Sequence, residues 1–269
     1  MASDYPPTRH ILRHLRLSHT TDENGKISGS MPILPDMLDA DGWLRLGIMA
    51  TLVDSVAGHH GVMQVQPDWV ATLQLGTVLT AQPSGDEVRA CCEPMRIGRN
   101  NVVTETRIED QNGLIGHSIC TFARLPARPG FELPKIATRN RVVDYAEENE
   151  ESPRPNFDDY LQMNINPDKP IIELPHHSRI YNSFGSIQGG AVVVLVERMA
   201  RHIAELEDER NARCITADVH YLAQAKDGPF KVEGEVLRKD AMGVTSQVTI
   251  RDLGSGRLLD VATATAVYL

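Results

Sequence analysis

The sequence predicts an α+β protein made of two similar units, each with one long helix and an antiparallel sheet. Its 269 residues fit two domains or one large one, at about 100–200 residues per domain. Residues 46–60 (LGIMATLVDSVAGHH) align with residues 189–203 (GGAVVVLVERMARHI). Each copy is followed by the same succession of strand-like segments and turns. A repeat of this kind indicates that one structural unit occurs twice.

Composition and charge narrow the function classes. Hydrophobic residues are 41% of the chain and charged residues 23%, which is ordinary for a globular protein. The formal net charge of −9 argues against a nucleic acid as the main partner. No apolar run approaches the roughly 20 residues that span a bilayer, and the N-terminus lacks a signal-peptide pattern. We therefore expect a soluble, cytoplasmic protein without a membrane partner.

The four cysteines argue against metal or disulfide chemistry. Cys91 and Cys92 are adjacent, and neither Cys120 nor Cys214 completes a C-x-x-C pair. This usage favours reduced, partly buried thiols over a zinc site or a disulfide scaffold.

The first long helix is predicted from Leu46 onward. One face repeats apolar side chains at helical spacing: Leu46, Met49, Val53 and Val56. A second face is small apart from one acid: Gly47, Ala50, Asp54 and Gly58. Another element can therefore approach this face closely. Asp54 lies in an apolar run without a cation in the next four residues, and burial raises the pKa of such an acid. After Gly61 the pattern changes.

Strands are predicted after the helix in both halves. In the first half they fall near 70–82, 87–99, 102–110 and 114–125, separated by the turn signals QPSGD, IGRNN and DQNG. DQNG also indicates a hairpin. The second half repeats this with AKDG, KDAMG and DLGSG, and two more strands flank DENG before the first helix.

The segment 125–157 is a connector, rich in prolines and acids. Its composition favours a solvated linker, although part of it could pack along a sheet edge. The predicted organisation is a first domain at 1–126 with an N-terminal extension, a linker at 127–158 and a second domain at 159–269. Because one helix leaves much of its sheet uncovered, the two units are expected to pack together like a fused dimer.

The residues resemble a known family. A glycine-rich helix start, an acid further along the helix and strands ending in TFARLP (121–126) are similar to hotdog-fold acyl-CoA thioesterases of the PaaI-like type. The resemblance covers residues 20–126 and 165–269. It implies a double hotdog, in which each long helix is wrapped by its sheet and active sites lie between the units.

The family motif before the helix resembles N-x-x-G-x-x-H-G-G. The second half reads NSFGSIQGG, in which Asn182, Gly185, Gly189 and Gly190 match and Gln188 stands where histidine is common. The first half reads DADGWLRLG. There Gly42 and Gly47 match, but the remaining motif positions are replaced by Asp39, Arg45 and Leu46.

The resemblance implies two unequal sites, because the family combines the acid of one unit with the helix start of the other. One site joins Asp54 to Asn182, Gln188, Gly189 and Gly190. The other joins Glu197 to Asp39, Arg45, Leu46 and Gly47. Arg201 follows Glu197 at i+4, a spacing that favours an ion pair, and Arg198 adds positive charge. We therefore expect Glu197 to be structural and the first site to be catalytic.

This site suits thioester hydrolysis. Free amides at a helix start, around Gly189 and Gly190, can stabilise the oxyanion of an attacked carbonyl. Asp54 would act as general base or as nucleophile through an anhydride. The alternative for Asp54 is a hydrogen-bonded structural acid on a helix face. For Asn182 and Gln188 the alternative is hydrogen bonding within the loop.

Other candidates have weaker signals. Four cations in matching turns of the two halves could bind coenzyme A phosphates or simply be solvated: Arg96, Arg99, Arg238 and Lys239. His59 and His60 fit the end of the first helix, where a histidine favours the dipole. His176 and His177 fit a surface loop near the site. Trp43 and Trp69 could line an acyl pocket or pack in the core.

The predicted function is therefore that of an acyl-CoA thioesterase, with coenzyme A as part of the substrate, no other cofactor, no metal and a homodimer of double hotdogs as the assembly. The alternative is a non-catalytic acyl-CoA-binding or structural hotdog protein, since one of the two sites has already diverged. A hotdog hydratase ranks third, because GDEV (85–88) lacks the Asn-Pro and His of the G-D-x-N-P-x-H signature.

Overall fold

The computed structural model describes residues 5–127, 136–146 and 153–269. Within them, antiparallel strands form one continuous sheet in the order β7-β1-β2-β4-β5-β6-β3-β10-β13-β12-β11-β9-β8. The strands before Ala146 are β1 (Ser18–Thr21), β2 (Ile27–Pro32), β3 (Trp69–Leu79), β4 (Glu87–Ile97), β5 (Asn101–Asp110), β6 (Gly113–Leu125) and β7 (Arg141–Asp144). The later strands are β8 (Asn164–Ile165), β9 (Ile171–Leu174), β10 (Ala212–Tyr221), β11 (Phe230–Asp240), β12 (Gly243–Asp252) and β13 (Leu258–Tyr268).

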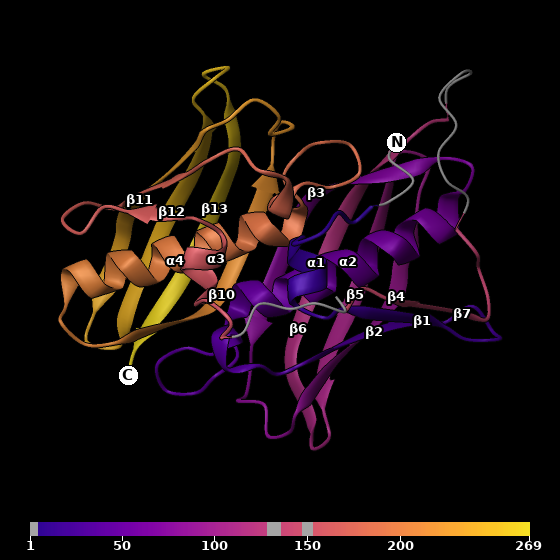
Figure 1. Ribbon diagram of the computed structural model, residues 1–269, viewed down its shortest axis with the longest axis horizontal. Coiled ribbons are helices and arrows are strands. Elements are labelled where there is room, and N and C mark those ends of the chain that lie inside the picture. Colours follow the sequence, from indigo (N-terminus) through magenta and orange to yellow (C-terminus); the bar gives the residue numbers. More distant parts are fainter. Residues whose placement is uncertain (1–4, 128–135, 147–152) are drawn as a thin grey trace.

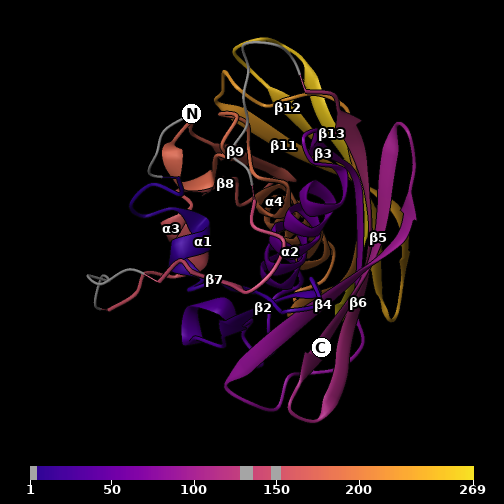
Figure 2. The ribbon, with the colours of Figure 1, turned by 90° about the vertical axis from the view of Figure 1, so that its right-hand side faces the viewer.

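Two long helices lie against this sheet, α2 (Leu46–Val65) and α4 (Gly189–Glu207) (Figure 1). The sheet curves round them on one side, while two short helices, α1 (Ile11–His14) and α3 (Phe157–Tyr160), lie on the other (Figure 2). The 3-10 turns Pro35–Met37 and Ser178–Ile180 precede the two long helices. Both helices are thus enclosed, which explains why α2 has buried residues on every face.

The two halves of the sheet have the same strand order, read outward from the centre. The first half runs β3-β6-β5-β4-β2 and the second runs β10-β13-β12-β11-β9. They join where β3 pairs with β10, with Leu75 opposite Val219 and with Gln74–His220 and Gly76–Asp218 on either side. The junction therefore has an approximate twofold arrangement.

The two long helices touch each other at their glycines. A Cβ atom on Gly47 would lie 2.5 Å from Val194 Cα, and one on Gly190 would lie 2.3 Å from Thr51 Cα. These two contacts involve aligned positions, since Gly47 matches Gly190 and Thr51 matches Val194. The prediction that the small face of the first helix admits a close neighbour is confirmed, and that neighbour is the other helix.

Most predicted elements are confirmed, with small shifts at their ends. The strands around DENG and after each long helix are present. The first helix does not stop near Gly61 but continues to Val65, because Val62 and Val65 are buried and prolong its apolar face. The described part of the connector packs on the protein, since β7 pairs with β1 at the sheet edge. The domain boundaries stay a prediction, because one sheet runs through both halves.

The four thiols are free, and Cys92, Cys120 and Cys214 are buried. No group of described residues has the geometry of a metal site. None of the described helices is long and apolar enough to cross a membrane.

Candidate active site

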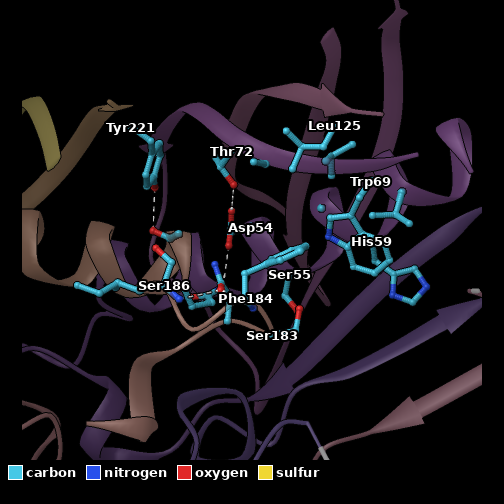
Figure 3. A pocket seen from close by; sticks show the side chains of 18 of the residues that line it. Asp54, Ser55, His59, Trp69, Thr72, Leu125, Ser183, Phe184, Ser186 and Tyr221 are labelled. Atoms are coloured by element: carbon cyan, nitrogen blue, oxygen red, sulfur yellow. Dashed lines mark hydrogen bonds between the residues drawn. The ribbon is translucent and has the colours of Figure 1, made fainter. Parts of the chain in front are cut away.

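Asp54 of α2 meets the start of α4, as the predicted site requires. The amide Nε2 of Gln188 donates to Asp54 Oδ2 at 2.7 Å, and the Gly190 N–H donates to the same oxygen at 3.2 Å. The Thr72 hydroxyl, from β3, donates to Asp54 Oδ1 at 3.0 Å. Figure 3 shows Asp54 held between Thr72 and the loop before α4. The carboxylate is therefore fixed by donors from both halves of the chain.

The start of α4 is organised around this carboxylate. Gln188 is the N-cap residue, and its Oε1 accepts a hydrogen bond from the Ala191 N–H at 2.8 Å while its Nε2 reaches Asp54. A Cβ atom at Gly189 would lie 2.7 Å from Asp54 Oδ1, so any larger residue would push the carboxylate away. The Gly189 carbonyl accepts a hydrogen bond from the Tyr221 hydroxyl at 2.7 Å. The hydrogen bonds of Gln188 and of the Tyr221 hydroxyl fix the backbone that faces Asp54.

Burial raises the pKa of Asp54 to about 6, although the Thr72 hydroxyl and the Gly190 and Gly189 amides oppose the rise. Asp54 is only 8% exposed, so desolvation of the charged form exceeds the stabilisation by donors. A carboxylate with this pKa is about nine-tenths ionised at pH 7 and still accepts a proton readily. The sequence-based expectation of a perturbed acid is confirmed.

Asp54 lies in the wall of a cavity of about 860 Å³. Gln188, Gly189 and Asn182 also line it, together with Trp69, whose ring meets Phe184 edge-on at 5.9 Å. No gap separates Asp54 from the start of α4, since the carboxylate accepts the Gly190 amide directly. The room for a substrate lies beside this contact, along the cavity.

At the equivalent helix contact in the other half, around Glu197, an ion pair occupies the place of the Asp54–Gln188 contact. Arg45, which aligns with Gln188, donates to Glu197 Oε2 from Nε at 3.0 Å and from Nη2 at 2.8 Å. The predicted ion pair between Glu197 and Arg201 is present at 3.4 Å but is the longer one. Arg45 also binds Asp158 at 2.9 Å, and Arg198 binds the other oxygen of Asp158 at 2.9 Å. Glu197 is therefore buried and held by two arginines.

The loops before the two helices keep the same shape despite their different sequences. Asn182 Oδ1 accepts from the Phe184 and Ser186 N–H groups, at 2.9 and 3.1 Å. Asp39 Oδ1 accepts from the amides two and four residues later in the same way, and its Oδ2 accepts from Arg213 at 2.6 Å. The side chain of Asn182 thus makes hydrogen bonds within the loop, which is the alternative that the sequence left open. Gln188 bonds both to the backbone at the helix start and to Asp54.

The other candidates are distributed over the molecule. Four predicted phosphate-binding cations lie outside the residues that line the cavity: Arg96, Arg99, Arg238 and Lys239. The two on β11 are already paired, Arg238 with Asp240 and Lys239 with Glu207.

The remaining histidines and tryptophans divide between the cavity and the rest of the protein. His59 lines the cavity, and both His59 and His60 are inside α2 rather than at its end, because the helix continues to Val65. His176 and His177 bond to the carbonyls of Lys226 and Leu161 and are not among the residues that line the cavity. Trp43 lies under the Arg213 guanidinium at 3.9 Å.

Comparisons with known proteins show the fold. No protein-family model matches the chain, and no curated protein matches it. Among the similar solved structures is a conserved protein of unknown function with a hotdog fold from Alicyclobacillus acidocaldarius, with a TM-score of 0.63 and 11% identity over 96% of this chain and 97% of that one. An acyl-ACP thioesterase from Bacteroides thetaiotaomicron has a TM-score of 0.60 and 12% identity, over 90% of this chain and 98% of that one. A 12:0-ACP thioesterase from Umbellularia californica has a TM-score of 0.60 and 10% identity, over 90% of this chain and 94% of that one.

The chain has the hotdog fold. The sheet wraps the long helices α2 and α4, as expected for this fold (Figure 2). Asp54 lies where α2 meets the start of α4.

Several residues at this site are absent from the sequence-based list. Thr72 and Tyr221 contact the site from β3 and β10, and His19 of β1 and Arg141 of β7 line the same cavity. The turn and period patterns place Thr72, Tyr221 and His19 on strands, whereas Arg141 falls in the predicted connector. Which strand faces Asp54 depends on the assembled sheet. The one sequence feature that could have indicated Thr72 is its position near the start of β3, the first strand after the helix that carries Asp54.

Proposed function

We propose that the protein is a tandem double hotdog of the PaaI-like type that hydrolyses acyl-CoA thioesters at the Asp54 site. The observation that carries the proposal is the contact of a buried carboxylate, with a pKa of about 6, with the amide-rich start of α4 in the wall of a cavity. General acid–base catalysis works best when the pKa of the catalytic group lies near the working pH.

In the proposed reaction Asp54 takes a proton from a water molecule, whose oxygen attacks the thioester carbonyl carbon. The carbonyl oxygen becomes an oxyanion, and the Gly189 and Gly190 amides stabilise it. Because the Gly190 amide is bonded to Asp54 at rest, the carboxylate turns toward the water as the carbonyl oxygen takes its place. Collapse of the oxyanion breaks the C–S bond, and the proton on Asp54 passes to the leaving thiolate.

The alternative chemistry uses Asp54 as the nucleophile. Its carboxylate attacks the carbonyl, the thiolate leaves, and water hydrolyses the mixed anhydride. A single turnover in ¹⁸O-labelled water separates the routes, because only the anhydride route can leave label in the Asp54 carboxyl group.

The choice of coenzyme A as carrier has support from the turn between β4 and β5. Arg96 lies at the end of β4 and Arg99 in the turn that follows, and neither is in an ion pair with another described residue. The next strand pairs Asn101 with the cavity-lining Ala123. Two free cations near one end of the cavity suit phosphate groups. Acyl-CoA and acyl-ACP substrates can be compared directly in the same thiol-release assay.

The test is release of free thiol from a panel of acyl-CoA thioesters. Asp54→Asn should lower kcat about 10²–10⁴-fold while keeping the affinity for a non-hydrolysable thioether analogue. The control is Asp218→Asn, since Asp218 lies on β10 with its side chain 46% exposed, outside the cavity. A wild-type protein that releases no thiol from any member of the panel contradicts the proposal. If it still binds the thioethers, the non-catalytic binding function holds instead.

A further inference from the structure

The cavity has a second polar region away from the start of α4. Ser55 and His59 of α2 lie along the same wall as Asp54 (Figure 3). His19 of β1 and Arg141 of β7 complete this region. Ser55 Oγ and His19 Nε2 are hydrogen-bonded at 3.1 Å, and the rings of His19 and His59 meet edge-on at 5.3 Å. The proposed reaction at Asp54 uses none of these groups.

Two imidazole nitrogens of this region are buried without a partner among the described residues, His19 Nδ1 and His59 Nε2. His19 is only 3% exposed. Buried polar atoms are nearly always hydrogen-bonded, so an unpartnered one requires an explanation. Burial lowers the pKa of His19 to about 3 and that of His59 to about 4. Both rings are therefore neutral, and each has one buried nitrogen whose hydrogen-bonding capacity is unused among the described residues.

Arg141 gives the region its charge. No ion pair joins its half-buried side chain to another described residue, and its positive charge contributes to the lowered pKa values of both histidines. Asp54 is the single carboxylate among the described residues that line the cavity, and it is already held by three donors. The positive charge of Arg141 is thus uncompensated within the described part of the cavity.

We propose that His19, His59 and Arg141 bind a carboxylate at the far end of the acyl group, so that the preferred substrates are thioesters of dicarboxylic acids. This inference rests on the proposed function, because it places the thioester carbonyl at Asp54. The five-residue rise from Asp54 to His59 on α2 is about 7.5 Å, which roughly five methylene groups span. Arg141 supplies the charge-assisted hydrogen bond, and the imidazoles supply the remaining polar contacts.

Binding of non-hydrolysable thioethers tests the site without relying on turnover. The probes are S-(ω-carboxyalkyl) and S-alkyl thioethers of equal length, each made on pantetheine and on coenzyme A and measured by calorimetry. The wild type should bind the carboxylated pantetheine probe at least 10-fold more tightly than the methyl-ended one. Arg141→Gln should abolish this preference. Arg139→Gln is the matched control, since Arg139 is exposed on the same segment and does not line the cavity.

Equal affinity of the wild type for the two pantetheine probes would overturn the inference. So would an Arg141→Gln effect confined to the coenzyme A probes, because Arg141 would then be holding a phosphate. The outcome is separable from that of the proposed function. A protein that discriminates between the thioethers but hydrolyses nothing keeps this site and loses the catalytic proposal, whereas an active enzyme without discrimination does the reverse.

Discussion

Replacing Asp54 by asparagine should make the protein more stable as it makes it inactive. Asparagine has the same shape as the carboxylate and can keep its contacts. Its side-chain oxygen can accept from Gln188 and Gly190, and its amide can donate to Thr72, whose hydroxyl rotates to accept. The variant removes a buried charge without opening a cavity.

The magnitude follows from the pKa of Asp54. Folding raises it from 3.8 to about 6, a difference of about two units, and each unit is worth about 1.4 kcal/mol. Because the folded pKa is the higher one, the stabilisation from binding the proton is complete below about pH 3.8 and lost as the pH rises through about 6. Above that pH the buried charge costs the wild type about 3 kcal/mol. The neutral side chain of the variant carries no such cost.

The assay is urea denaturation of wild type and Asp54→Asn at pH 4, 6 and 8. The variant should exceed the wild type by about 3 kcal/mol in unfolding free energy at pH 8, and the difference should shrink toward zero at pH 4. Asp218→Asn, on an exposed carboxylate, should show no comparable trend. A difference that is the same at all three pH values, or a variant less stable than wild type at pH 8, would refute the reasoning.

Three further predictions follow from the site and its counterpart. The proposed mechanism needs Asp54 ionised, so thioester hydrolysis should rise with pH through about 6. A kcat profile flat from pH 5 to 8 would exclude Asp54 as the base. Glu197→Gln should destabilise the protein by about 3–5 kcal/mol, since the buried Arg45 keeps only Asp158 of its two carboxylate partners. Denaturation curves measure this loss, and an unchanged unfolding free energy would contradict the structural role of the Arg45–Glu197 pair. Gly190→Ala should destabilise the protein, because the added Cβ would lie 2.3 Å from the backbone of the other helix. Gly58→Ala, whose Cβ would have 3.9 Å to its nearest neighbour, should be neutral or stabilising by up to about 1 kcal/mol. Thermal unfolding compares the two variants, and equal midpoints would show that the two helices can move apart to admit the methyl group.

The sequence predicts the elements well because local patterns determine them. Helical spacing places the first long helix, turn signals bound the strands, and the repeat makes Asp54 and Glu197 equivalent. The same repeat brings Asp54 and Gln188 into one site through the family resemblance. These predictions depend on neighbours in the chain or on a copy of the same pattern.

The missed features depend on contacts between distant segments. The i+4 spacing predicts Arg201 as the partner of Glu197, but Arg45, 152 residues before it, is closer. Arg141 falls in a stretch whose composition resembles a linker, and only its pairing beside β1 brings it to the cavity. Periodicity indicates which residues are buried, but it does not indicate which distant residues they contact.

Carrying both helices on one chain has an evolutionary consequence. In an assembly of two identical chains, any replacement at the helix cap appears at both sites together. Here the two caps are encoded separately, so one could become an arginine that locks a glutamate while the other stayed a glutamine facing an aspartate. The two contacts between the long helices therefore differ: an ion pair closes one of them, and the other lies in the wall of a cavity.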